Sequence, residues 1–407
     1  MLSFEAARAK VAEVLGARSG ARETETVDIS DPASALGRIL AEEVIADRDY
    51  PPFDRSTRDG YALRAADAAE VGAKLRLIGE SRAGIPFDGA AGLGECVRIM
   101  TGAAVPRGAD AVVMQEYARV EGDWVALERA VSRGQNIVVA GSESRAGDAL
   151  VARGARLAYA ELAIAAQAGR AKLRVNRRPK VAILSTGDEV VGVTDSPGPF
   201  QIRNSNSVSL AAQVELAGGE VVALGNARDD SGDLRERIER GLASDALVLS
   251  GGVSVGTYDL VEQVLRDLGA EFFFDSVAIR PGRPAVFGWC RGKPVFGLPG
   301  NPVSTMVTFE LFVAPAIEVL AGAAARRAVF CKAKLAHAVS EKAPLAHFLP
   351  ARMSWTSGDP VVETVAWQGS GDVGAVVRGN CFLVVRGERQ RLEAGEWVDV
   401  LPRRGLI

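Results

Sequence analysis

The chain has 407 residues, of which 48 are Lys or Arg and 51 are Asp or Glu, so its formal net charge is −3. This balance argues against a strongly basic nucleic-acid binder, and an aromatic content of 6% argues against a base-stacking surface. Only two His are present and the four Cys form no CxxC pair, which argues against a His-rich metal site, a zinc site and a redox motif.

The N-terminal residues 3–17 are predicted to form an amphipathic helix with one apolar stripe. The stripe consists of Phe4, Ala7, Val11, Val14 and Leu15. Charged residues interrupt the apolar pattern, so the segment lacks the continuous apolar region of a signal peptide. We expect a cytoplasmic protein with reduced, mostly buried cysteines. The most apolar stretch, residues 303–325, contains Glu310, Pro315 and Glu318, which favours a buried helix over a membrane span.

Residues 27–140 contain short apolar segments separated by Gly and Pro, a pattern typical of strands and turns. Residues 157–168 return to a helical pattern. From 180 to about 325, predicted strands and helices alternate, which favours a mostly parallel, doubly wound α/β sheet. Helices are expected at 207–217, 234–243, 260–268 and 303–313, and strands at 181–184, 221–224, 246–249, 272–274 and 294–296. Residues 330–404 return to short strands, as in a small barrel or sandwich.

Glycine accounts for 44 of the 407 residues, against about 7% in average proteins, and part of this excess lies in three polar loops. The loops are residues 185–189, 250–256 and 297–302, and each follows a predicted strand of the α/β segment. Ligands bind outside the carboxyl ends of the strands in an open parallel sheet, so the three loops are expected to face one crevice. The second and third loops lead into helices, whose free N–H groups favour an anion.

Five carboxylates lie in or near these loops: Asp188, Glu189, Asp229, Asp230 and Asp259. Such hard oxygen ligands suit Mg²⁺, which usually also binds a substrate phosphate. Acidic surface loops are common, so each carboxylate alone is also compatible with a solvated side chain. Arg280 and Arg283 stand in an Arg-Pro-Gly-Arg-Pro sequence after the strand at 272–274, and two fixed cations there would suit phosphate or another oxyanion.

Three catalytic motifs are absent or incomplete. Residues 252–256 match the GxSxG pattern of serine hydrolases, but the only histidines, His337 and His347, lie in the last segment and no oxyanion motif is present. No GxxxxGK[ST] sequence indicates a phosphate-binding P-loop, and no GxGxxG indicates a dinucleotide site. A hydrolase of this type, a P-loop enzyme and a dinucleotide-dependent enzyme are therefore disfavoured.

Two further turn-rich segments, 51–61 and 100–106, indicate no function by their residues alone. Taken in chain order, however, seven segments resemble the molybdopterin molybdenumtransferase family, which also includes the C-terminal domain of gephyrin. They are PPFDRSTRDGYALR, RIMTGAAVPRGADAVVMQE, VAILSTGDEVV, IRNSNS, SGGVSVGTYDLV, IRPGRPAVFG and GLPGNPVSTMVTFELF. The likeness runs from Gly37 to residues 368–371 and so covers nearly the whole chain.

The resemblance implies an enzyme that inserts molybdenum from molybdate into adenylated molybdopterin and releases AMP, with Mg²⁺ as the divalent cation. It implies an elongated homodimer, with each active site between the β-rich domain of one subunit and the last two domains of the other. The implied domains are a helical one (1–26 and 146–177), a β-rich one (27–145), an α/β sandwich (178–328) and a C-terminal β-barrel (329–407). The implied protein partners are a molybdopterin adenylyltransferase and recipient molybdoenzymes, and no nucleic acid or membrane is expected to take part.

The family's functional positions carry over residue by residue. Catalytic positions match Asp59, Thr101, Asp188 and Asp259, and metal-binding positions match Asp188, Glu189, Asp229, Asp230 and Asp259. Substrate-binding positions match Ser185, Thr186, Gly187, Glu189, Gly251, Gly252, Ser254, Arg280, Arg283, Pro299, Asn301, Pro302, Arg352 and Ser370. Asp59 and Thr101 belong to the β-rich domain, which the implied dimer would bring to the cleft of the other subunit.

The chain departs from the family pattern at five places, one of which is Asn204, where an Asp is usual. Arg280 and Arg283 replace lysines, so the charge is kept but the planar guanidinium differs in geometry. Glu143 stands where an Asp is usual, the DRSTRDG sequence places two additional arginines beside Asp59, and Pro350 stands where an Arg is usual.

The expected chemistry is electrophilic assistance to a bound pyrophosphate, with molybdate held close to the dithiolene sulfurs by cations and Ser370. Two alternatives stay open at this point: a molybdopterin adenylyltransferase, and a non-catalytic scaffold of the same fold. Tungsten in place of molybdenum is also compatible with the sequence.

Overall fold

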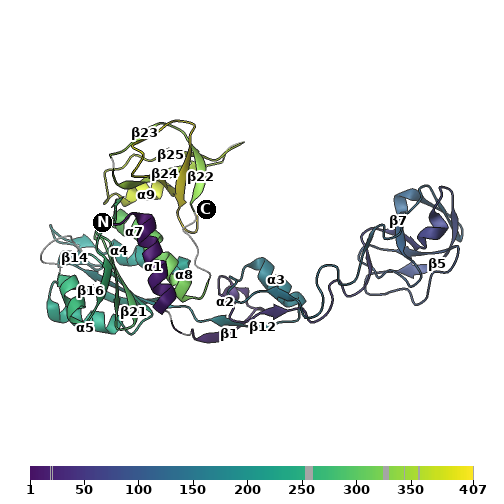
Figure 1. Cartoon of the computed structure of the whole chain (residues 1–407), viewed down its shortest axis with the longest axis horizontal. Coiled ribbons are helices and arrows are strands. Elements are labelled where there is room, and N and C mark those ends of the chain that lie inside the picture. The colour runs from purple at the N-terminus through teal and green to yellow at the C-terminus, as the bar shows by residue number, and fades with distance from the viewer. Residues whose placement is uncertain are drawn as a thin grey trace.

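The computed structural model describes residues 1–18, 20, 22–252, 260–323, 330–342, 344–355 and 358–406. Figure 1 shows an elongated molecule: an α/β body and the C-terminal part lie side by side at one end, an arm extends from the body, and a β-rich module lies at the far end. We call these parts the body, the barrel, the arm and the tip, and define each below by its elements.

The body is built on a six-stranded sheet in the order β16-β13-β17-β21-β20-β18. The strands are β13 (Lys180–Thr186), β16 (Glu220–Ala227), β17 (Ala246–Ser250), β18 (Glu271–Phe274), β20 (Val286–Cys290) and β21 (Lys293–Leu298). The first four in the sheet order are parallel, whereas β20 runs antiparallel to both β21 and β18. The mostly parallel sheet is confirmed, with an antiparallel edge that the sequence did not reveal.

The sequence missed strand β20 because glycine weakens the strand pattern in its middle. A Cβ on Gly288 would lie 2.9 Å from the carbonyl oxygen of Glu271 on β18, so glycine permits the two strands to approach closely.

Helices cover both faces of this sheet, which confirms the doubly wound fold. One face packs against α4 (Ser205–Ala217) and a continuous helix formed by α7 (Pro302–Thr308), the π-helical η3 (Phe309–Val313) and α8 (Ala314–Leu320). The other face packs against α5 (Ser231–Gly241) and α6 (Leu260–Asp267).

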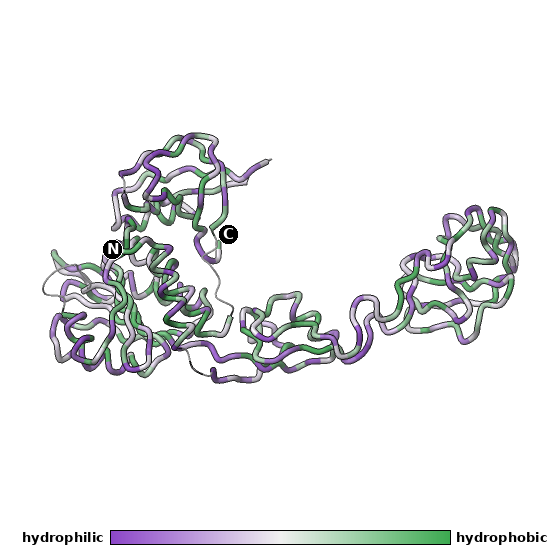
Figure 2. Tube along the Cα trace, in the orientation of Figure 1, coloured by the Kyte–Doolittle hydropathy of each residue, from purple (hydrophilic) through white to green (hydrophobic). Residues whose placement is uncertain are grey.

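The helix over residues 302–320 is long and apolar enough to span a membrane, but 78% of its most apolar window is buried inside the protein. In Figure 2, hydrophobic residues, coloured green, are frequent along the helices of the body. The prediction of a buried helix in this stretch is confirmed.

The predicted N-terminal helix is α1 (Phe4–Arg18), and all five residues of its predicted stripe are buried. It packs against α8 and η3, so these side chains are part of the core of the body. In the arm, β1 (Thr24–Asp28) pairs antiparallel with β12 (Lys172–Asn176), and β2 (Val44–Ile45) pairs with β11 (Ala149–Val151). Helices α2 (Pro32–Ala35) and α3 (Tyr159–Gln167) complete the arm, which has its own apolar core.

The tip contains a six-stranded sheet in the order β7-β4-β6-β5-β9-β8. Its strands are β4 (Gly60–Leu63), β5 (Lys74–Ser81), β6 (Glu95–Ile99), β7 (Ala111–Met114), β8 (Ala118–Glu121) and β9 (Trp124–Leu127), with short 3₁₀ turns at Ala65–Ala68 and Gln115–Tyr117. The short strands β3 (Arg55–Ser56) and β10 (Ile137–Val138) pair antiparallel where the chain enters and leaves the tip.

The barrel closes through five strands: β24 (Ala346–Ser354), β25 (Val361–Thr364), β22 (Cys331–Leu335), β28 (Trp397–Pro402) and β26 (Cys381–Val385), which returns to β24. This confirms the small barrel expected after residue 330. Helix α9 (Val373–Arg378) and the pair β23 (Val339–Ser340) and β27 (Arg391–Leu392) complete it. The body contributes β19 (Ile279–Arg280), which pairs parallel with β24 and so joins the two parts.

All four cysteines are free thiols, and Cys96, Cys290 and Cys381 are buried. Burial raises the pKa of Cys96 and of Cys381 to about 12. The expectation of reduced, mostly buried cysteines therefore agrees with the structure.

Candidate substrate site

A cavity of about 480 Å³ lies at the carboxyl ends of β13, β17 and β21. The three glycine-rich loops meet there, as the strand-end argument predicts. Its lining includes ten of the predicted residues: Ser185, Thr186, Gly187, Glu189, Asp229, Gly251, Gly252, Pro299, Asn301 and Pro302. The loops are in close contact, because a Cβ on Gly251 would lie 2.7 Å from the carbonyl oxygen of Thr186. Gly251 also has a φ of +86°, so both its conformation and its surroundings require glycine.

Asparagine side chains that the sequence analysis did not single out hold the loops in place. The Asn206 side-chain amide donates to Ser250 Oγ at 2.9 Å and to the Gly300 carbonyl at 2.8 Å, which joins the second loop to the third. Asn226 donates to the carbonyl of Gly187 at 2.9 Å. Asn206 lies in the IRNSNS segment of the family resemblance, and that segment could have identified it as a site residue. Asn226 lies outside all seven segments, so nothing in the sequence indicated its role.

In the described part of the chain, two polar atoms of residues that line the cavity are buried without a hydrogen-bond partner: Thr186 Oγ1 and Asn206 Oδ1. The Thr186 side chain is inside the cavity wall, and the residue is only 3% exposed. Buried hydroxyl and amide groups in folded proteins nearly always have partners, and the exceptions call for a reason. These two atoms are therefore candidates for contact with a polar ligand of the cavity.

The carboxylates Asp188, Glu189 and Asp229 are close enough to influence one another. The Asp229 backbone N–H donates to Asp188 Oδ1 at 3.2 Å. Partial desolvation raises the pKa of Asp229, and the negative charges of Asp188 and Glu189 raise it further. This mutual repulsion favours a bound cation. Within the described residues no group of three or more His, Cys, Asp or Glu is arranged to hold a metal, but Mg²⁺ commonly uses one or two carboxylates and completes its shell with water and substrate phosphate.

The remaining predicted metal ligands differ in position. Asp230 is the N-cap of α5, and its Oδ1 accepts hydrogen bonds from the backbone N–H groups of Gly232 and Asp233 at 3.0 and 2.9 Å. One of its oxygens is therefore engaged in capping the helix. Asp259 and the predicted substrate contact Ser254 lie outside the described residues.

The four predicted oxyanion-binding residues do not line the cavity. Arg280 and Arg283 are exposed, and within the described part of the chain no carboxylate lies within 4 Å of either guanidinium. Ser370 belongs to the barrel, and its carbonyl accepts the Val303 backbone N–H at 2.9 Å, next to the third loop. Arg352 is exposed on β24, opposite Glu363 of β25.

Asp59 and Thr101 contact each other in the tip, at the far end of the molecule from the cavity (Figure 1). Asp59 Oδ1 accepts from both the backbone N–H and the hydroxyl of Thr101, each at 2.7 Å. These two hydrogen bonds, the backbone one most strongly, lower the pKa of Asp59, and the nearby Arg98 lowers it further. The pair is exposed, and the carboxylate is held ionised at neutral pH.

Two of the departures from the family pattern form a pair on the tip side. Arg55 Nη2 donates to Glu143 Oε1 at 2.8 Å, so the additional arginine and the longer carboxylate contact each other. The sequence did not indicate this pairing, since the two residues are 88 positions apart.

Comparison with known proteins gives consistent matches along the chain. Residues 2–169 match the MoeA N-terminal region (domains I and II), residues 182–319 match a probable molybdopterin binding domain, and residues 332–402 match the MoeA C-terminal region (domain IV). A molybdopterin molybdenumtransferase of Staphylococcus aureus is 34% identical over 375 residues, which are 90% of this chain and 89% of that protein. One of Staphylococcus epidermidis is 33% identical over 372 residues, with the same coverage.

The fold is shared with solved structures. A crystal structure of the molybdopterin biosynthesis MoeA protein from Pyrococcus horikoshii OT3 has a TM-score of 0.81 at 28% identity, covering 99% of this chain and 100% of that one. A second Pyrococcus structure of a molybdopterin biosynthesis MoeA protein has a TM-score of 0.75 at 33% identity, covering 99% of both chains.

Proposed function

The chain belongs to the molybdopterin molybdenumtransferase family and inserts molybdenum into molybdopterin; we propose that its substrates are molybdate and adenylated molybdopterin and that it releases AMP. The observation that carries the proposal is the cavity at the strand ends, with its two unpartnered polar atoms and its adjoining carboxylates. An ester of phosphate has the acceptor oxygens and the charge that such a site would bind.

Different residues around the cavity would bind the substrate, Mg²⁺ and molybdate. Thr186 Oγ1 would donate to a substrate oxygen, and Asn206 Oδ1 would accept from a substrate N–H or O–H group. Asp188 and Asp229, with Glu189 beside them, would hold Mg²⁺, which when bound would neutralise the pyrophosphate charge. Arg280, Arg283 and the Ser370 loop would hold molybdate near the dithiolene.

We further infer that the enzyme acts as a homodimer in which each tip completes the site of the other subunit. Asp59 and Thr101 support this inference, because they form an exposed, ionised pair that lies far from the cavity of their own chain. The domain bounds expected from the sequence, a cytoplasmic location, a partner adenylyltransferase and recipient molybdoenzymes are part of the same proposal.

The test is cofactor formation by the purified full-length chain from adenylated molybdopterin and molybdate, with AMP release followed while Mg²⁺ is varied. We expect Asp188→Asn and Asp229→Asn to need more Mg²⁺ and to lose at least about tenfold in rate at limiting Mg²⁺. Glu236→Gln, which changes an exposed carboxylate of α5 in the same body, is the control. Full activity of both Asp variants at limiting Mg²⁺ would remove these carboxylates from the proposal.

The same assay separates the alternatives. Consumption of ATP with unadenylated molybdopterin and no molybdate would favour an adenylyltransferase. A parallel reaction with tungstate in place of molybdate measures the metal preference.

A further inference from the structure

The helix over residues 302–320 begins at the cavity and ends at the arm. Its first residue, Pro302, lines the cavity. At its other end, Gly322 N–H donates to the Val319 carbonyl at 2.9 Å and Ala323 N–H donates to the Glu318 carbonyl at 3.0 Å. This pair of bonds, with Gly322 at a φ of +88°, is a Schellman termination. It leaves the carbonyls of Leu320 and Ala321 without a partner from the helix itself.

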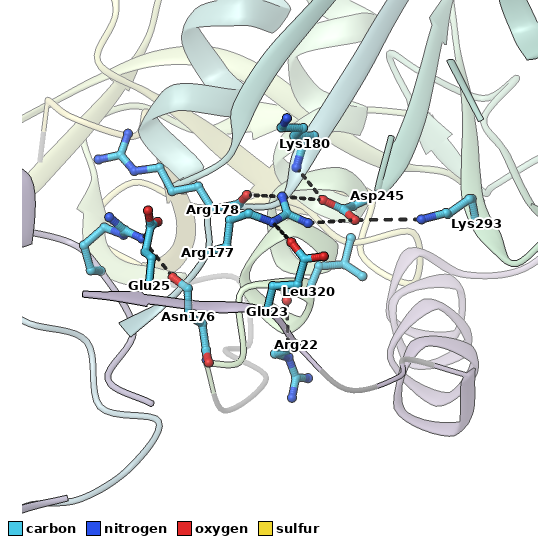
Figure 3. Close-up of polar contacts among 11 residues, drawn as sticks. Arg22, Glu23, Glu25, Asn176, Arg177, Arg178, Lys180, Asp245, Lys293 and Leu320 are labelled. Atoms are coloured by element: carbon cyan, nitrogen blue, oxygen red, sulfur yellow. Dashed lines mark hydrogen bonds and ion pairs between the residues drawn. The ribbon is translucent and has the colours of Figure 1, made fainter. Parts of the chain in front are cut away.

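Side chains of the arm bind these free carbonyls. Arg22, which precedes β1, donates from Nε to the Leu320 carbonyl at 3.2 Å. Its Nη2 donates at 3.0 Å to the Val319 carbonyl, which also accepts the Gly322 N–H. Asn176 Nδ2, from the end of β12, donates to the Ala321 carbonyl at 2.9 Å. Figure 3 shows Arg22 and Leu320 in this contact. A cation at the negative end of a helix dipole adds a favourable electrostatic interaction, so the arm acts as the C-terminal cap of the helix.

The arm approaches this helix end too closely for any side chain at position 322. A Cβ on Gly322 would lie 2.3 Å from Asn176 Nδ2 and 3.0 Å from Arg22 Cδ. Asn176 is 8% exposed and its own backbone is tied into β12, so it has little room to move away.

A second contact joins the arm to the amino-terminal edge of the central sheet (Figure 3). Arg177 follows β12, and its guanidinium pairs with Asp245 at 3.0 Å and with Glu23 at 2.7 Å. Asp245 directly precedes β17 and also accepts the Lys180 backbone N–H at 2.7 Å. The arm thus contacts the body at two separate points, one at a helix end and one at a sheet edge. Two points of contact fix the orientation of the arm relative to the body, which a single point would not.

We propose that Arg22, Asn176 and Arg177 are positioning residues, which set the arm on the body and thereby set where Asp59 and Thr101 reach the partner's cavity. The inference rests on the proposed function. A helix of 19 residues is about 28 Å long. One rigid element would therefore connect the third loop of the cavity to the contacts of Arg22, Asn176 and Arg177 with the body, which we call the joint. Arg22, Asn176 and Arg177 join the arm to the body through hydrogen bonds and ion pairs. The apolar cores of the two parts are separate clusters, so single substitutions here can disturb the joint without opening a core.

The principal test compares Gly322→Ala with Gly269→Ala. Gly269 ends α6 with the same pair of bonds and a φ of +85°, but a Cβ there meets nothing within 4 Å. Both variants therefore introduce the same backbone strain, and only Gly322→Ala pushes against the arm. We expect Gly322→Ala to change the small-angle X-ray scattering profile and to lower the rate of cofactor formation about tenfold, with unchanged affinity for adenylated molybdopterin in the absence of molybdate.

Arg22→Lys is a milder second variant, because it keeps the charge but loses the fork that reaches two carbonyls. Its control is Arg153→Ala, which changes another exposed arginine of the arm. We expect Arg22→Lys to lower the turnover rate two- to fivefold with unchanged substrate affinity, and Arg153→Ala to match the parent chain. If Gly322→Ala and Gly269→Ala give the same scattering profile and the same rate, the positioning role is refuted.

Asp59→Asn separates this inference from the proposed function. With the joint intact, Asp59→Asn should abolish most activity and leave the scattering profile unchanged. Full activity of Asp59→Asn would overturn the contribution of the tip to the site, and with it the reason for a positioned arm. An inactive Asp59→Asn together with a fully active Gly322→Ala would overturn the positioning role alone.

Discussion

Thr186→Val is expected to make the ligand-free protein more stable and to weaken its binding of substrate. The Thr186 hydroxyl is buried and has no partner among the described residues, so the protein bears the desolvation of this group without a compensating hydrogen bond. Mutational data put such a penalty at about 1–3 kcal/mol, and valine has nearly the same shape. For a folding unit of 150–250 residues, each kcal/mol corresponds to about 2–4 °C in Tm. Scanning calorimetry should therefore show a transition about 2–12 °C higher.

Thr186→Val should, in contrast to its effect on stability, weaken the binding of adenylated molybdopterin. A hydrogen bond from Thr186 to a charged substrate oxygen is worth about 1.5–3 kcal/mol, which corresponds to about 10- to 100-fold in Kd for adenylated molybdopterin. Thr308→Val is the matched control, since Thr308 is also fully buried but its hydroxyl donates to the Ser304 carbonyl at 2.8 Å. That variant should lose about 1 kcal/mol of stability and keep its substrate affinity. If Thr186→Val is destabilised like the control, or binds substrate as tightly as the parent, the reasoning about the unpartnered hydroxyl is wrong.

Three further predictions concern charge and thiol chemistry. Folding raises the pKa of Asp229, so the folded state loses stability as the pH rises above the ordinary value of 3.8. Asp229→Asn should therefore increase the free energy of unfolding at pH 7. Denaturant titrations should show that this increase disappears below pH 3.8. A double-mutant cycle on Arg55 and Glu143 should give a coupling of about 0.2–1 kcal/mol that falls with added salt, because the pair is half-exposed; a coupling insensitive to salt would contradict this. Cys96 and Cys381 should resist a thiol reagent at pH 8 until the protein unfolds, and rapid native-state labelling of either would disprove their burial.

Local patterns in the sequence predicted the body well. The stripe from Phe4 to Leu15 follows the helical repeat, and it is buried as expected. The glycine-rich loops converge because parallel strands place their carboxyl ends at one edge, a consequence of topology that needs no knowledge of side-chain contacts.

Contacts between distant residues could not be predicted in this way. The bonds of Asp59 with Thr101 join residues 42 positions apart, and the Asn206 bond to Gly300 joins residues 94 positions apart. No periodicity encodes such pairs, because they depend on how whole elements pack. The exact bounds of the four domains and the roles of the site residues stay predictions.

The position of α1 has a consequence for synthesis of the protein. This helix is synthesised before the rest of the body, yet its apolar stripe packs against α8 and η3, near the end of the body. Arg22, just after the helix, lies 298 positions before its partner Leu320. At about 5–20 residues per second, roughly 15–60 s pass before that partner is made. During this interval the tip and the arm can fold, whereas the apolar stripe of α1 has no α8 or η3 to pack against.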